Sequence, residues 1–452
     1  MKMLLVQPPA PEDGLAGNDT FLLEPLALEY ISASVRDLCT TRLCDLRIED
    51  DLDATLREMQ PDFVGLTGYT VDVTSICRLV PRIRAVLPGA KIIIGGHHAT
   101  VQPEDFLGCR PDFLVRGEGI RAIREIVKAG PAASGAPLAH PQLTVEQRGD
   151  TLQVTQEGVV PLSEFPLPDR SLVERYRKGY FLYWWKPVAS IRASAGCRYR
   201  CNFCTLWESY QGRYFTRDPR EVAEEIRGLD AEYILFSDDE SFLDREYMSE
   251  IADQLEAQGV KKKYRMLART DTIVRSKDVI KRWRSIGLEQ MFVGVEAMNN
   301  ARLKAMNKGT TTEVNEEAIR FLQSIGVHVI TDFIIHQDFT REDFRALRKY
   351  VRQLKLSSAV YTIMTPLPGT RYYKENEHRL IDKNPEHFDV MHTLLPTALP
   401  LKEFYREFHA LYLKSGSLCE RIRFLSRFSW TDTWDIIRKY RRVSAKLRQL
   451  YR

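Results

Sequence analysis

The chain has 452 residues, of which 44% are hydrophobic and 28% are charged, and its formal net charge is +4. This length is too great for one ordinary domain, and the composition is typical of a globular protein with two or three domains. So small a net charge gives no argument for nucleic-acid binding.

No segment of the sequence is expected to direct the chain into or across a membrane. Met1–Pro8 is an apolar, strand-like run that ends at Pro8-Pro9, which differs from the pattern of a signal peptide. No window of about 18–20 apolar residues occurs, so we expect no bilayer span. Eight cysteines without disulfide-like spacing are typical of a reducing compartment, and we therefore expect a cytoplasmic protein.

Strands and helices alternate through residues 1–130. Apolar runs predict strands at Met3–Val6, Arg42–Arg47, Phe63–Leu66, Lys91–Ile94 and Phe113–Val115, and helical periodicity is present at Leu26–Leu38, Leu52–Met59, Thr74–Leu87 and Ile120–Lys128. Repeated strand–helix order with short connections predicts a parallel sheet that is covered on both faces. We expect a doubly wound, flavodoxin-like α/β domain.

Residues 131–187 are expected to link this domain to a second one. Ala129–Pro141 is rich in Ala, Pro and Gly, as linkers are. Leu143–Thr155 alternates on both sides of Arg148-Gly149-Asp150, which predicts a short β-hairpin. Pro161–Pro187 is rich in proline and aromatic residues, and we expect it to wrap between the two larger bodies.

A second β/α series occupies residues 188–370. Its expected strands are Val188–Ser194, Tyr233–Phe236, Arg265–Ala268, Met291–Val295, Val327–Ile335 and Val360–Met364, and its expected helices are Pro219–Gly228, Arg245–Gln258, Lys277–Ile286, Thr312–Ile325 and Arg341–Leu354. Six such units predict a partial (β/α)6 barrel with its site at the carboxyl ends of the strands. Residues 371–452 are expected to be mostly helical.

Three cysteines lie close together directly after the first strand of this series. Cys197, Cys201 and Cys204 have the spacing C-x3-C-x2-C, which suits a loop whose thiolates bind one metal cluster. Three ligands leave one iron of a [4Fe-4S] cluster open to another ligand. Zinc is the main alternative, but its sites usually have paired spacings and four ligands. The other five cysteines are expected to be small buried hydrophobic residues: Cys39, Cys44, Cys77, Cys109 and Cys419.

This motif, with Phe203 before its last cysteine, closely resembles that of the radical S-adenosylmethionine (SAM) superfamily, and the resemblance extends from Val188 to about Gly369. It implies that the open iron binds the amino and carboxylate groups of SAM. It also implies that SAM is cleaved reductively to a 5′-deoxyadenosyl radical, with an electron donor such as a flavodoxin or ferredoxin as partner.

The resemblance also implies roles for charged residues at the ends of the barrel strands. Asp239 and Glu240 follow the second strand, where the family places acidic residues that hold the methionine ammonium. Arg269, after the third strand, would pair with the SAM carboxylate. Glu296, at the end of the fourth, would bind the ribose hydroxyls. The alternative is that these are the solvated charges that barrel strand ends often carry.

A flavodoxin-like domain ahead of such a barrel resembles the cobalamin-binding group of the superfamily. Its carboxyl edge, where open α/β sheets bind ligands, carries the candidate cobalamin-binding residues Thr67, Gly68, Tyr69, Thr70, Gly95, Gly96, His97, Gly117 and Glu118. Residues 9–14 lack the D-x-H-x-x-G motif whose histidine binds cobalt in mutase-type domains. We therefore expect cobalamin without a histidine ligand.

Two stretches resemble the hopanoid C-3 methylase branch of this group, namely Leu167–Arg170 with Tyr176–Tyr183, and His392–Thr397 with Leu401–Tyr405. The anaerobic porphyrin-ring cyclase branch shares the layout. The resemblance implies methylation of an unactivated carbon on a small-molecule, lipid or polycyclic substrate. The alternatives are a cyclase or oxidoreductase without methyl transfer, and a cobalamin-binding sensor that has no catalytic activity.

The C-terminal segment alternates basic and aromatic residues from Arg421 to Arg452. A basic helix with Trp and Phe can lie on an anionic bilayer surface, which would make the protein peripheral to the membrane. The alternative is a helix that packs on the barrel with its charges in solvent.

Overall fold

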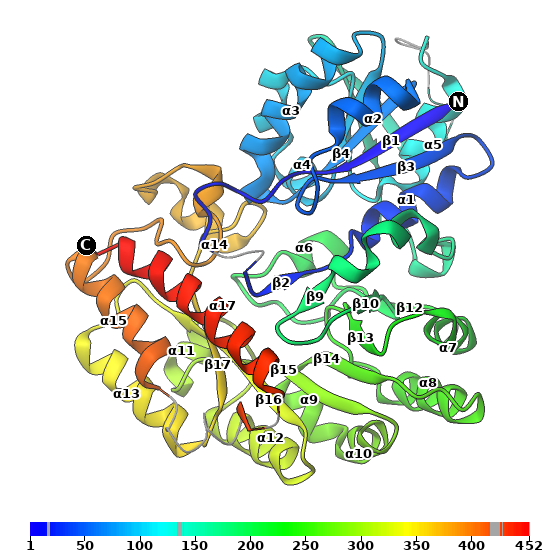
Figure 1. The fold of residues 1–452 in the computed structure, drawn as a ribbon. Coiled ribbons are helices and arrows are strands. Elements are labelled where there is room, and N and C mark those ends of the chain that lie inside the picture. The colour runs from blue at the N-terminus through cyan, green and yellow to red at the C-terminus, as the bar shows by residue number, and fades with distance from the viewer. Residues whose placement is uncertain (16–18, 133–137, 139, 416–424, 427, 452) are drawn as a thin grey trace.

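The computed structural model describes residues 1–452 except 16–18, 133–137, 139, 416–424, 427 and 452. It contains two large sheets with helices on their faces, one in the N-terminal third of the chain and one in the following half (Figure 1). No helix among the described residues is long and apolar enough to cross a membrane.

The first sheet has seven strands in the order β3-β1-β4-β5-β6-β8-β7. Their bounds are β1 Lys2–Gln7, β3 Thr40–Asp45, β4 Phe63–Thr67, β5 Lys91–Gly95, β6 Phe113–Arg116, β7 Leu143–Arg148 and β8 Thr151–Gln156. The first five strands in this order are parallel, which confirms the flavodoxin-like order that was expected from the sequence.

Helices cover both faces of this sheet because its strands are apolar on both sides. Met3 and Leu5 of β1 pack in a core with residues of α1 (Leu26–Val35) and α5 (Gly119–Ala129). Leu4 and Val6 pack in a second core with α2 and α3 on the opposite face. The bounds of the latter helices are α2 Leu52–Met59 and α3 Val73–Val86, and the short elements α4 His97–Val101 and η2 Pro103–Cys109 follow β5.

The hairpin that we expected in the linker is present, but it belongs to the first sheet. β8 pairs in parallel with β6, from Phe113–Leu152 to Arg116–Thr155, and β7 pairs antiparallel with β8. The sheet therefore continues past residue 130, where we expected the first domain to end. The short, local turn of the hairpin is visible in the sequence, whereas its pairing with β6 is not.

The second sheet has six parallel strands in the order β10-β13-β14-β15-β16-β17, as expected. The strands are β10 Val188–Ile191, β13 Tyr233–Phe236, β14 Lys263–Arg269, β15 Leu288–Glu296, β16 His328–Ile335 and β17 Ser358–Ile363. The helices between them are α7 Pro219–Gly228, α8 Arg245–Ala257, α10 Lys277–Ser285, α12 Thr312–Ser324 and α13 Arg341–Gln353. Alternate strand residues such as Met266, Val293 and Phe333 are buried against these helices.

Short elements that the sequence did not predict lie at the carboxyl ends of the barrel strands. They are β11 Ser194–Ala195, which pairs with β12 Phe215–Thr216, and the helices α6 Leu206–Tyr210, α9 Thr270–Arg275 and α11 Asn300–Ala305. The described part of the C-terminal region is mostly helical, as expected, with α14 Arg371–Asn376, α15 Leu401–Lys414 and α17 Trp430–Gln449.

A buried ion-pair network joins the two sheets through Arg170. Its guanidinium contacts Glu24 at 3.1 Å and Glu29 at 3.0 Å, which lie at the start of α1, and also Glu225 on α7 of the barrel. It also donates a hydrogen bond to the Ser190 carbonyl of β10 at 2.7 Å. Arg170 thus contacts the first domain and the barrel at once.

Replacing Arg170 by Met should strongly destabilise the protein, because it leaves the carboxylates of Glu24 and Glu29 buried without this cation. Removal of one partner from a buried pair typically costs about 3–5 kcal/mol. Denaturant unfolding followed by circular dichroism would measure the loss. The control is Arg42→Met. Because Arg42 pairs with the exposed Glu58, this substitution should change the free energy of unfolding by less than about 1 kcal/mol. Equal changes in the two variants would contradict this role of Arg170.

Candidate active site

The three cysteines of the C-x3-C-x2-C motif lie on the loop between β11 and α6, at the carboxyl end of the barrel. The Cys204 amide donates to the Cys201 carbonyl at 3.2 Å, which closes a turn around the last two cysteines. Burial, together with the charges of Cys201 and Cys197, raises the pKa of the Cys204 thiol to about 12. The last two cysteines of the motif are thus held on one turn of the loop.

The cysteine loop is fastened to the rest of the barrel by backbone contacts. The Asn202 amide donates to the Met306 carbonyl at 3.2 Å, and the Tyr372 amide donates to the Asn202 carbonyl at 3.0 Å. Phe203 packs on the small cluster that includes Ile334 and Met364. Phe203 thus anchors the loop between the second and third cysteines to the ends of β16 and β17.

Three consecutive acidic residues follow β13, and the structure gives each a different environment. Asp238 is buried and accepts hydrogen bonds from the amides of Ala193 and Ser194 at 2.8 and 3.0 Å. Asp239 is half-buried and accepts from the Gly196 amide at 2.7 Å, directly before the first cysteine. Asp238 thus holds the backbone that leads to the cysteines, while Asp239 still has an accessible carboxylate.

Glu240 is fully buried, and its carboxylate already has several donors from the chain. It accepts from the Arg269 amide at 2.6 Å and from the Thr272 hydroxyl at 2.8 Å. Burial is the largest cause that raises the pKa of Glu240, to about 7. Glu240 therefore links the end of β13 to the end of β14, and in this structure it acts on the site through Arg269.

Arg269 lies next to the cysteines at the end of β14. Its guanidinium is 3.6 Å from the Sγ atom of Cys201, donates to Asp271 at 2.9 Å, and stacks on the Tyr199 ring at 3.5 Å. This places a permanent positive charge beside the thiol of the second cysteine. Arg269 thus connects the cysteine loop to the end of β14.

Glu296, at the end of β15, forms a buried ion pair with Lys308 at 2.6 Å. Its backbone is in the left-handed region, with φ of 63°, which turns the carboxylate back over the strand. A Cβ atom at Gly294 would lie 2.6 Å from Glu296 Oε1 and 2.9 Å from Lys308 Nζ. A side chain at position 294 would therefore displace the ends of this ion pair.

The candidate cobalamin-binding residues come together on the carboxyl edge of the first sheet. Thr67, Gly68 and Tyr69 follow β4, and the loop after β5 packs against them. Gly96 has φ of 97°, and a Cβ there would be 2.5 Å from Thr67 Oγ1. The two loops thus form one continuous surface, with the Tyr69 side chain 67% exposed.

The remaining members of this set extend the same edge. Gly117 and Glu118 follow β6, and the Gly117 amide donates a hydrogen bond to the Thr100 hydroxyl of α4 at 3.0 Å. The His97 ring lies 5.9 Å from the Tyr69 ring. Gly95 has space around it, because a Cβ there would meet nothing closer than 3.7 Å.

His98 is not available as a cobalt ligand in this structure. It is buried, with Nδ1 3.0 Å from the Thr70 hydroxyl and Nε2 2.9 Å from the Asp105 carboxylate. Both ring nitrogens are therefore engaged by the protein. Burial and these two hydrogen bonds make His98 a structural residue of the domain.

The carboxyl edge of the first sheet faces the carboxyl end of the barrel. A Cβ atom at Gly369, after β17, would lie 2.7 Å from Val101 at the end of α4. Burial raises the pKa of Glu118 in the first domain, and the guanidinium of Arg192, directly after β10, lowers it. The same guanidinium also lowers the pKa of Asp239, again against the effect of burial. Arg192 therefore marks the place where the two candidate sites meet.

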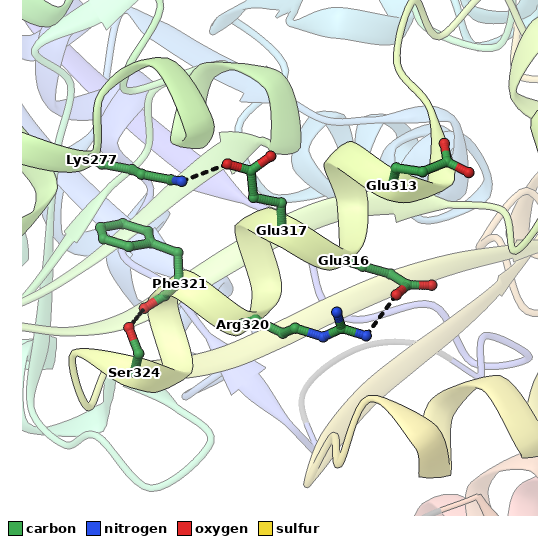
Figure 2. Close-up of a pocket in the computed structure, with 7 residues that line it drawn as sticks. All are labelled: Lys277, Glu313, Glu316, Glu317, Arg320, Phe321 and Ser324. Atoms are coloured by element: carbon green, nitrogen blue, oxygen red, sulfur yellow. Dashed lines mark hydrogen bonds and ion pairs between the residues drawn. The ribbon is translucent and has the colours of Figure 1, made fainter.

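A pocket elsewhere on the barrel contains none of the residues expected from the sequence (Figure 2). It lies on the outer helices and is lined by Lys277, Glu313, Glu316, Glu317, Arg320, Phe321 and Ser324. Glu317 pairs there with Lys277 at 2.5 Å and Glu316 with Arg320 at 2.8 Å. These pairs indicate a solvated helix surface, distant in the fold from the strand ends.

Lys308 and Arg192 are functional candidates that the sequence analysis missed. Arg192 had a detectable signal, since it is a charged residue that directly follows an apolar barrel strand. Lys308 had none, because it lies in a loop after α11, and its pairing with Glu296 depends on the turn of the backbone at that residue.

Comparisons with known proteins agree with this architecture. The model of the radical SAM superfamily matches residues 191–351, and that of the B12 binding domain matches residues 13–127. The hopanoid C-3 methylase of Methylococcus capsulatus is 32% identical over 422 residues, which cover 90% of this chain and 78% of that protein. The chain belongs to the cobalamin-dependent radical SAM methylases. Its cofactors are accordingly a [4Fe-4S] cluster, SAM and cobalamin.

Two more distant proteins are also similar to this chain over most of its length. The anaerobic magnesium-protoporphyrin IX monomethyl ester cyclase of Cereibacter sphaeroides is 27% identical over 354 residues, 74% of this chain and 56% of that protein. The structure of the cobalamin-dependent SAM radical enzyme OxsB with aqua-cobalamin bound has a TM-score of 0.69 at 16% identity, and covers 99% of this chain and 80% of that chain. The latter likeness supports the fold.

Replacing Gly294 by Ala should destabilise the methylase by about 1–3 kcal/mol, because the added methyl group would displace the buried ion pair of Glu296 and Lys308. Denaturant unfolding would measure this change. Gly89→Ala is the matched control, since no atom lies within 4 Å of a Cβ there, and it should change stability by less than about 0.5 kcal/mol. If Gly294→Ala left the free energy of unfolding unchanged, the ion pair of Glu296 and Lys308 would not depend on the space beside Gly294.

Proposed function

We propose that this methylase transfers a methyl group to an unactivated carbon of a lipid or polycyclic substrate. The observation that best supports a reaction between the two cofactor sites is their mutual position. A Cβ atom at Gly369, after β17, would lie 2.7 Å from Val101 at the end of α4 and 3.5 Å from Thr205, directly after the last cysteine. When bound, the cofactors supply a 5′-deoxyadenosyl radical and a methyl group. The residues of the chain bind, orient and enclose them.

Cys197, Cys201 and Cys204 are proposed as the cluster ligands. They stand on one short loop at the carboxyl end of the barrel, and the Arg269 guanidinium lies 3.6 Å from the Sγ atom of Cys201. Phe203 is proposed to hold the loop in place against the barrel. The ends of β13 and β14 would then determine where the cysteine loop holds the cluster relative to the barrel strands.

Asp239 is proposed as the acceptor for the SAM ammonium, since its half-buried carboxylate has one donor from the chain and room for more. Glu240 is proposed to act with it by holding the Arg269 backbone, and Arg269 to face the SAM carboxylate. Glu296 is proposed to bind the ribose hydroxyls, with Lys308 holding its carboxylate in position through their ion pair.

The carboxyl edge of the first sheet is proposed to bind cobalamin. Thr67–Thr70, Gly95–His97 and Gly117–Glu118 form one surface, which is consistent with contact by a large planar ligand. Tyr69 is the most exposed side chain of this set and would meet the ligand first. Because Thr70 and Asp105 engage both nitrogens of His98, we propose that cobalt has no ligand from that histidine.

The helix α17 supports a lipid substrate independently. One face packs on the protein, with Leu447 buried, Ser444 bonded to His409 at 2.7 Å and Lys439 donating to the Tyr183 carbonyl at 3.0 Å. The N-terminal end of the helix exposes Trp430 and Trp434, at 75% and 51%. A helix packed on the protein was one of the two interpretations of the sequence. The exposed tryptophans are consistent with the second interpretation, in which the helix also lies on a bilayer surface.

A second candidate function is cyclisation or oxidation without methyl transfer, which the similarity to the magnesium-protoporphyrin cyclase favours. A flavodoxin or ferredoxin is proposed as the electron donor in either case.

Reconstituted enzyme with SAM, reductant and lipid extract from a strain that lacks the gene should form 5′-deoxyadenosine and a product heavier by one CH2. Mass spectrometry would detect both. Cys201→Ala should lose cluster absorbance and both products, because one iron ligand is missing, whereas Cys39→Ala should keep them. A product of unchanged carbon number would favour the cyclase or oxidoreductase, and absence of 5′-deoxyadenosine would exclude radical chemistry.

The enzyme should sediment with vesicles that contain phosphatidylserine more than with neutral vesicles, since α17 presents exposed tryptophans beside Arg438, Arg441 and Arg442. Trp430→Ala/Trp434→Ala should reduce the bound fraction several-fold. Tyr440→Phe, on the same helix, is the control, because it keeps the aromatic ring. Equal sedimentation of all proteins would contradict membrane contact through this helix.

A further inference from the structure

Two cysteines of the first domain, outside the cluster motif, lie in direct contact. Cys77 is on α3 and Cys109 ends η2, and their Sγ atoms are 2.8 Å apart although the residues are 32 positions apart in sequence. A disulfide bond has a length of about 2.05 Å, so a small side-chain movement would bring the sulfurs to bonding distance. Both residues pack against the second core of the first domain, as expected of small hydrophobic residues, but they are half-buried rather than buried.

The other cysteines of the domain differ from this pair in their burial, which determines how reactive a thiol is. Cys39 and Cys44 are 7% and 0% exposed, and burial raises the pKa of both thiols. Buried thiols with raised pKa values are inert. Cys419 lies outside the described residues. Cys77 and Cys109 are thus the accessible pair of the first domain among the residues that the structure describes.

The two thiols of the pair are not equivalent. The Cys77 thiol donates to the sulfur of Cys109, which lowers the pKa of Cys109 and raises that of Cys77. Cys109 would therefore carry the thiolate more readily, and the thiolate is the nucleophile in thiol–disulfide exchange. Cys77 is placed to attack second.

We propose that Cys77 and Cys109 form a reversible disulfide when the methylase meets a small-molecule disulfide such as oxidised glutathione. The Cys109 thiolate attacks one sulfur of glutathione disulfide and releases one glutathione thiolate. The Cys77 thiolate then attacks the Cys109 sulfur and releases the second. The two cysteines lose two electrons and two protons, glutathione disulfide gains the two electrons, and the protons pass to solvent or to the released thiolates.

The bridge would fasten η2 to α3 beneath the candidate cobalamin-binding edge. η2 carries Asp105, which holds His98, and His98 in turn contacts Thr70 in the loop after β4. Oxidation would therefore restrict the movement of η2, and through Asp105 and His98 that of the loop after β4. The disulfide itself would contact none of the candidate cofactor-binding residues. A cross-link across a segment of this length should also stabilise the domain, because it restricts the unfolded chain.

Anaerobic treatment of the cluster- and cobalamin-loaded protein with oxidised glutathione, followed by alkylation and peptide mass spectrometry, tests the proposal. We expect a linked pair of peptides that contain Cys77 and Cys109, which dithiothreitol separates, while Cys39 and Cys44 stay unlinked. The apparent Tm should rise by about 5 °C on oxidation. Free alkylation of both thiols after treatment, with no linked peptide, would overturn the proposal.

Single variants test the order of attack and provide matched controls. Cys77→Ser should accumulate a mixed disulfide of Cys109 with glutathione, because the second attack is lost, and its Tm should not rise on oxidation. Cys109→Ser should leave Cys77 without an adduct. An adduct on Cys77 but none on Cys109 in these variants would overturn the assignment of Cys109 as the nucleophile.

Discussion

The buried guanidinium of Arg170 is the interaction on which the rest of this structure depends. It contacts Glu24 and Glu29 of the first domain and Glu225 of the barrel, and none of these side chains has access to bulk water that could replace it. Ion pairs of this kind contribute little net stability compared with apolar packing, but they tolerate little change in geometry. A network that joins two sheets by hydrogen bonds therefore fixes their relative position more sharply than an apolar contact would.

That fixed position determines what the enzyme can do. Each sheet by itself presents a carboxyl edge suited to one cofactor, as open and closed parallel sheets generally do. Because the edges face one another across Arg192, a substrate held between them can reach both without leaving the protein. The proposed cobalamin and SAM sites would then be neighbours, which agrees with the membership of the chain in the cobalamin-dependent radical SAM methylases.

Sequence patterns predicted the elements of both sheets because buried parallel strands are short apolar runs between helical segments. They also placed Asp239, Arg269 and Glu296 at strand ends, since a strand's carboxyl end is evident once its apolar run stops. They did not reveal that Glu240 is already bonded to the Arg269 backbone, or that Lys308 pairs with Glu296. Such partners are brought together by tertiary folding and leave no periodic signal. The contact of Cys77 with Cys109 was hidden for the same reason.

The hairpin of β7 and β8 has a consequence for the solubility of the protein. Without it, β6 would be the edge strand of an apolar, fully parallel sheet, with unpaired amides and carbonyls that favour pairing with another molecule. The hairpin covers that edge and replaces it with β7, whose residues from Thr144 to Arg148 are exposed and include Glu146. A charged, short outer strand discourages edge-to-edge association. The segment that joins the two domains thereby also protects the first of them from aggregation.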